Sequence, residues 1–79
     1  MTFIDIRDRV IKPKLTDILG RALADGLYTK ARFATTGARG QRHKLNTFVT
    51  TVCADPHFIG MWGTAQAARQ EKEWLELFL

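Results

Sequence analysis

Few side chains in this sequence are of the types that perform catalysis or hold a metal ion. The sequence contains one cysteine, Cys53, and two histidines, His43 and His57. A protein metal site needs several histidine, cysteine or carboxylate ligands that converge at short spacing, and these residues do not show that pattern. We therefore expect no metal site and no cofactor.

A thiol nucleophile with an imidazole base is also poorly supported. Cys53 and His57 are four residues apart, so the two side chains would meet on one continuous helix. Pro56 lies between them and disfavours such a helix. Cys53 also completes an apolar stripe, where a free cysteine packs as a small apolar residue. We expect no catalytic residue and predict that the protein is not an enzyme.

A glycine-containing stretch, Gly37-Ala38-Arg39-Gly40, resembles a phosphate-binding loop only in part. It has two glycines and an arginine but lacks the Gly-Lys-Ser/Thr ending of nucleotide-binding loops. Its backbone amides could bind an anion ahead of the next helix. Two glycines in a loop more often mark only a turn.

The distribution of charge is the most informative feature of the sequence. The net charge is +4 over 79 residues, but residues 26–54 carry five cations and no carboxylate, whereas residues 55–79 sum to −2. His43 lies in the same segment and gains charge below about pH 6.5. A local positive field of this kind attracts polyanions. The five cations are Lys30, Arg32, Arg39, Arg42 and Lys44.

Three interpretations of this basic segment remain open. The slightly favoured one is binding of DNA or RNA, with the five cations and His43 near phosphates and with Tyr28 and Phe33 stacking on bases. The second is docking on an acidic protein surface. The third is a solvated face whose charge serves only solubility.

The C-terminal third is rich in large apolar side chains. Most of them should be core in so small a domain, but the last six residues hold five large apolar side chains on more than one helical face. A second surface, either a partner protein or another copy of this chain in a homodimer, would cover them. The candidate interface residues are Trp62, Trp74 and Phe78.

The pattern predicts a mostly α fold, a single domain over 1–79, formed by a small bundle of three to four helices with a basic loop or short β-hairpin in the middle. The alternative is an α+β fold in helix–hairpin–helix order. Thr2 can cap a first helix, and Pro13 should kink or break it near Lys12. A second helix is expected over 13–24 and should be stopped by Gly26.

The middle and the end of the chain are assigned from periodicity and caps. Residues 27–35 alternate with a period of two, which predicts a short strand or an extended arm, followed by a loop over 36–41. Residues 44–54 have strand propensity but helical apolar spacing, and we predict a helix; a strand there would pair with 27–35. Asp55 should cap a short helical turn, and Thr64 should cap a last helix from Ala65 towards Leu79.

Three short segments are similar to part of a known family. Gly37-Ala38-Arg39-Gly40, Leu45-Asn46-Thr47-Phe48 and Asp55-Pro56-His57-Phe58 resemble a helical segment of the small subunit of extradiol ring-cleavage dioxygenases. The resemblance covers about a quarter of the chain, in residue types that are common in all proteins. The flanking segments do not match, so no function is inferred from it.

The sequence thus predicts a small, non-enzymatic regulatory protein that docks on a macromolecule through its basic segment. The alternative is a protein-binding inhibitor or adaptor, of the kind carried by phages and mobile elements, which would use the basic segment and a C-terminal aromatic face. No secretory segment and no stretch of about 20 apolar residues is visible, so we expect no membrane span. With a single cysteine, a cytoplasmic location is the simplest expectation.

Overall fold

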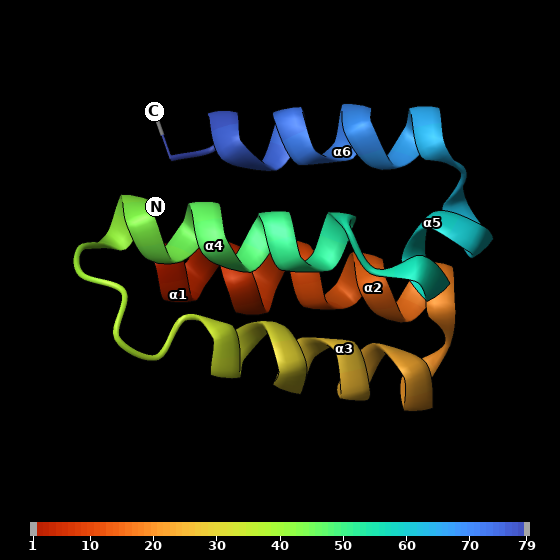
Figure 1. The fold of residues 1–79 in the computed structure, drawn as a ribbon, viewed down its shortest axis with the longest axis horizontal. Coiled ribbons are helices and arrows are strands. Elements are labelled where there is room, and N and C mark those ends of the chain that lie inside the picture. The colour runs from red at the N-terminus through yellow and green to blue at the C-terminus, as the bar shows by residue number, and fades with distance from the viewer. Residues whose placement is uncertain (1, 79) are drawn as a thin grey trace.

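The computed structural model describes residues 2–78, and these are almost entirely helical (Figure 1). The mostly α prediction is confirmed, but five helical rods form instead of three to four, and no strand or hairpin occurs within residues 2–78. The first rod is continuous from α1 through η1 to α2. The elements are α1 (Phe3–Asp5), η1 (Ile6–Ile11), α2 (Lys12–Leu19), α3 (Arg21–Ala34), α4 (Gln41–Cys53), α5 (Pro56–Trp62) and α6 (Thr64–Glu76).

The first rod passes through Pro13 without breaking. Thr2 caps it as predicted, because its hydroxyl accepts a hydrogen bond from the Asp5 amide at 3.2 Å. Pro13 stands in the first turn of α2, where its missing donor matters least. The turns before it are π-helical, with the Lys12 amide donating to the Arg7 carbonyl five residues back. A wider helical turn thus stands where we predicted a kink or break.

The second helix ends earlier than predicted, because Gly20 rather than Gly26 terminates it. Gly20 has φ 81° and ψ 162°, a conformation that is essentially restricted to glycine. Gly26 lies inside α3 and has no positive φ. The apolar spacing from Leu15 to Leu23 therefore spans two helices, and Leu23 is exposed.

The predicted strand or arm over 27–35 is wrong, since residues 27–34 are the second half of α3. The buried residues of this helix are Ala24, Leu27 and Ala31, which recur at helical spacing on one face. A strand would bury every second residue, including Phe33. In the structure Leu27 and Ala31 are buried, but Phe33 is exposed. A loop over residues 35–40 then leads into α4.

The helix predicted over 44–54 is confirmed, and it forms the centre of the bundle. In Figure 1, α4 lies between α3 and α6, and the first rod packs behind it. Phe48 is fully buried, and the rings of Phe3 and Tyr28 meet it edge to face at 5.9 and 5.8 Å. The buried residues of α4 are Leu45, Phe48, Val49, Val52 and Cys53.

The last two helices follow the expected order with one change of cap. The Asp55 carboxylate accepts hydrogen bonds from the amides of His57 at 2.9 Å and Phe58 at 3.4 Å, so the predicted cap of α5 is confirmed. Thr64 is the first residue of α6 rather than its cap, because Gly63 at φ 100° occupies the cap position. Leu79, in the predicted helix, lies outside the described residues.

The two glycines that the sequence does not tell apart should respond oppositely to alanine. Neither position has an atom within 4 Å of an added Cβ, so only backbone conformation separates them. Gly26→Ala should raise the free energy of unfolding by about 0.5–1 kcal/mol, because it removes a flexible residue from a helix interior. Gly20→Ala should lower it by about 1–3 kcal/mol through backbone strain. Urea denaturation measures both, and equal effects would contradict the assigned helix boundary.

Candidate nucleic-acid interface

One end of the bundle gathers most of the basic segment. The loop over 35–40, the start of α4, the start of α1 and the end of α6 all meet there, at the left in Figure 1. The Phe3 amide donates to Gln41 Oε1 at 3.0 Å, which fastens the start of α1 to the start of α4. We call this region the basic end, and its cationic residues are Arg7, Arg32, Arg39, Arg42, His43 and Lys44.

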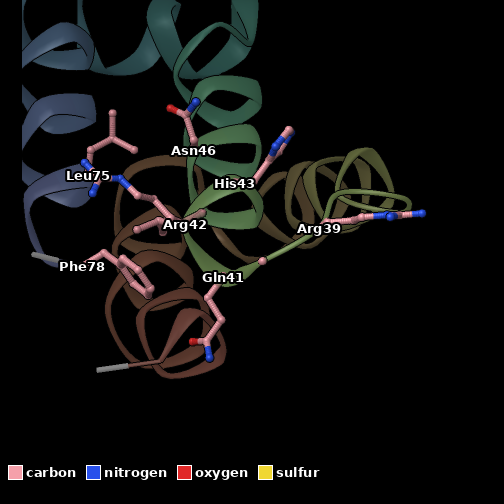
Figure 2. A pocket seen from close by; sticks show the side chains of 9 residues that line it. Arg39, Gln41, Arg42, His43, Asn46, Leu75 and Phe78 are labelled. Atoms are coloured by element: carbon pink, nitrogen blue, oxygen red, sulfur yellow. The ribbon is translucent and has the colours of Figure 1, made fainter.

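The larger hollow of the basic end, the α4–α6 cleft, lies between the first turns of α4 and the end of α6. It has a volume of about 880 Å³, and none of the described residues that line it carries a carboxylate. Figure 2 shows the Arg42 side chain reaching across to α6 beside Leu75, whereas Arg39 extends away from α6. Gln41 points towards the first rod. The arginines therefore spread over a surface and do not converge on one small anion.

The second hollow, the α1–α3 cleft, lies on the other side of the loop and has a volume of about 470 Å³. Cations from three helices line it: Arg7, Arg32 and Lys44. No carboxylate lines this cleft either. Two large apolar side chains stand exposed on it, Ile4 at 58% and Phe33 at 79%.

The two clefts are connected around the start of α4. A smaller hollow of about 290 Å³ lies between them and shares Gln41 with the α4–α6 cleft and Lys44 with the α1–α3 cleft. Within residues 2–78, no ion pair joins Arg32, Arg39, Arg42 or Lys44 to a carboxylate. The basic end thus presents four cations that have no ion-pair partner among residues 2–78, with exposed apolar side chains among them.

The first turn of α4 has an electrostatic arrangement that does not favour the helix. Gly40 at its N-cap provides no side-chain cap, and no acidic residue lies in the first turn. Arg42, His43 and Lys44 stand there instead, at the end where the helix dipole is positive. Cations at this end destabilise a helix, so this turn would be stabilised by an external anion.

Lys30 is the one predicted basic residue that the fold separates from the others. Its ammonium lies 3.3 Å from a carboxylate oxygen of Asp55, beside a different hollow. Burial alone would raise the pKa of Asp55, but hydrogen bonds from Lys30 and from the amides of His57 and Phe58 outweigh it and lower that pKa. Lys30 therefore supports the cap of α5.

The three predicted aromatic anchors are largely covered. Trp74 is 2% exposed and packs against Phe58 with ring centroids 6.2 Å apart, so it belongs to the core and offers no anchor on the surface of this chain. Trp62 is half-buried, with the Lys14 ammonium 4.8 Å from its ring and its indole N–H without a hydrogen-bond acceptor. Phe78 is half-buried at the edge of the α4–α6 cleft.

Arg7 is a residue of the basic end that the charge count did not single out. Its guanidinium makes two hydrogen bonds to Asp8, at 2.8 and 3.1 Å, and lies 5.6 Å from the ring centres of Phe3 and Tyr28. The Tyr28 hydroxyl donates to the same carboxylate at 2.6 Å. The adjacent opposite charges Arg7-Asp8 were a signal in the sequence, but they lie outside the basic segment on which the prediction was built.

This Arg7–Asp8–Tyr28 cluster is a structural unit. The Arg7 hydrogen bonds lower the pKa of Asp8 to about 2 and raise the pKa of Arg7 itself. Burial, with the hydrogen bond to Asp8, raises the pKa of Tyr28. Tyr28 is half-buried and engaged in this unit, so of the two aromatic residues considered for base stacking, Phe33 is the accessible one.

Other kinds of site find little support among residues 2–78. In that range no three histidine, cysteine or acidic residues lie close enough to hold a metal ion together. Nor does any helix there have both the length and the apolar character needed to cross a membrane. Cys53 is buried, and burial raises the pKa of its thiol to about 12. A thiol in that state supplies almost no thiolate at neutral pH.

Comparisons with protein-family models, with curated proteins and with solved structures find no match to this chain. They give no support to the resemblance of three short segments to a dioxygenase subunit. A functional assignment therefore depends on the chemistry of the basic end.

Removal of the Asp8 charge should destabilise the fold in a pH-dependent way. The pKa of Asp8 in the folded protein, about 2, lies below the ordinary value of an aspartate, 3.8. Its charge therefore stabilises the fold above about pH 3.8, and this stabilisation is lost as the pH falls towards 2. Asp8→Asn should lower the free energy of unfolding by about 1 kcal/mol at neutral pH. The difference from wild type should shrink below about pH 4. Urea denaturation across pH tests this, and a pH-independent difference would contradict it.

Cys53 should be unreactive until the protein unfolds. A thiol with a pKa of about 12 in the core should react with Ellman's reagent far more slowly than a small thiol at pH 8. Addition of denaturing urea should restore the full rate. Fast labelling in native buffer would show that α4 and α6 open readily around this residue.

Proposed function

We propose that this protein is a small, non-enzymatic regulatory protein that binds nucleic acid through its basic end. The observation that carries the proposal is the gathering of cations from α3, α4 and the loop between them around two neighbouring clefts. Among residues 2–78, these cations have no ion-pair partner and no carboxylate lines either cleft. A surface of this kind binds phosphates by displacing their counterions.

Two further features support a polyanionic partner. The first turn of α4 has exposed cations and no cap, so its amides and side chains both favour negative charge. The arginines spread across the surface in Figure 2, which suits a chain of phosphates better than one compact anion. Arginine and lysine are the usual phosphate partners in such interfaces.

The competing function, a protein-binding inhibitor or adaptor, has lost one of its three predicted anchors. It required a C-terminal aromatic face, and Trp74 is a core residue packed on Phe58. Aromatic anchors of protein interfaces must be able to enter a pocket of the partner. The exposed apolar residues of the basic end, Ile4 and Phe33, lie among cations instead, which suits a partner that combines phosphates with flat bases.

Charge reversal at the basic end should weaken the binding of nucleic acid. In a fluorescence-anisotropy titration with a labelled oligonucleotide, the affinity of the wild type should fall steeply between about 50 mM and about 200 mM salt. Arg39→Glu/Arg42→Glu should weaken binding at least about 10-fold and reduce the slope of log K against log salt by about 2, because two phosphate contacts are lost.

The control is a variant with the same net charge and an intact basic end. Arg21→Glu/Arg69→Glu also changes the net charge from +4 to 0, but Arg21 starts α3 at the opposite end of the bundle and Arg69 lies on α6. It should retain most of the binding. No binding by the wild type at about 50 mM salt, or equal losses in both variants, would overturn the proposed function.

A further inference from the structure

The α1–α3 cleft combines an accessible aromatic ring, Phe33, with cations among its other lining residues. The geometry points to single-stranded nucleic acid as the ligand of the basic end, with one base stacked on Phe33 and the adjoining phosphates near Arg32 and Lys44. This inference rests on the proposed function and names the form of nucleic acid that the surface takes.

Phe33 is a large apolar residue at a position that the fold leaves exposed. It lies in the last turn of α3, on the face opposite the buried Ala24, Leu27 and Ala31, and 79% of it is accessible. No rotation of α3 could bury Phe33 without exposing that core stripe. A flat, exposed ring of this kind is the element on which proteins stack unpaired bases, because every base has a π-face.

The charges around Phe33 match the phosphates that would flank a stacked base. Arg32 precedes it in α3, and Lys44 of α4 lines the same cleft. Neither takes part in an ion pair within residues 2–78. Arg7, whose charge is balanced by Asp8, also lines the cleft. The volume of about 470 Å³ lies within the usual range for sites that take a small organic group.

The arrangement of α3 and α4 does not suit the reading of a duplex. A recognition helix presents base-contacting side chains from a helix that enters the major groove. In α4 the cations stop after the first turn, and the exposed positions beyond it include Asn46 and Thr50. Figure 1 shows α4 between α3 and α6 over most of its length, with only its start extending past them, so α4 does not stand out from the bundle as a separate helix. In a duplex the base faces are covered by stacking and are closed to Phe33.

The test compares Phe33 variants on single-stranded and duplex DNA. Anisotropy titrations would use a labelled oligodeoxythymidine of about twelve nucleotides and a blunt duplex of the same length. Phe33→Ala should weaken single-strand binding about 5- to 100-fold, the range set by loss of one stacked base, and should leave the salt slope unchanged. Phe33→Tyr should retain the wild-type affinity, because the ring remains.

The matched control is Leu23→Ala, which removes an exposed apolar side chain from the same helix outside the cleft. It should bind like wild type. All variants lie at exposed helical positions, and circular dichroism confirms that they are folded. The expected result is tighter binding of the single strand than of the duplex, with the effect of Phe33→Ala confined to the single strand.

Three results would overturn the inference, and they are distinguishable. Equal binding of both forms, or equal loss on both with Phe33→Ala, would leave nucleic-acid binding standing and reject the single-strand assignment. Binding of neither form would reject the proposed function as well. Binding of a glutamate homopolymer as tight as that of the oligonucleotide, with loss in Phe33→Ala, would assign the basic end to an acidic protein partner.

Discussion

The burial of α4 is the constraint on which the rest of the molecule depends. This helix contacts α1, α3, α5 and α6, and Phe48 at its middle is closed in by rings from the first rod and from α3. A domain of this size has little apolar surface to spare, so one central helix serves as the wall against which α1, α3, α5 and α6 pack. The charged residues of α4 all stand in its first turn, where the covering elements end.

This placement contributes cations to one end of the bundle. Beyond its first turn, α4 packs against its neighbours and has no charged residue. Arg42 and Lys44, with His43 between them, occupy the first turn next to the loop. Arg32 reaches the same end because α3 runs back to it. Lys30, only half a turn earlier on α3, falls on the side that faces Asp55. The basic segment of the sequence therefore forms the basic end of the bundle, except for Lys30, which lies away from it.

The sequence predicts the helical class, the cap at Asp55 and the position of α4, because apolar spacing and cap chemistry are local properties. It does not separate the two glycines near the α2–α3 junction, since either could end a helix and only tertiary packing decides which one does. It also misplaces residues 27–34. Their alternation of apolar and polar types fits a strand, whereas Ala24, Leu27 and Ala31 fit a helix once the chain upstream has turned at Gly20.

The sequence predicts the charge of the candidate site but not which of its side chains are exposed. A count of cations finds Arg39 and Arg42, yet no local pattern reveals that Trp74 is enclosed while Phe33 is exposed, because both depend on which face of a helix meets the core. Arg7 joins the basic end through packing between segments distant in sequence.

Two features of the basic end run against stability. An uncapped first turn with cations at the positive end of its dipole destabilises α4, and an exposed phenyl on α3 leaves apolar area in water. Acidic residues in that turn and a polar residue at Phe33 would both favour the folded state. Proteins tend to carry such locally destabilising residues at their functional sites, whereas the rest of the sequence favours the folded state. Here the two features are adjacent, and one ligand with phosphates and flat bases would relieve both.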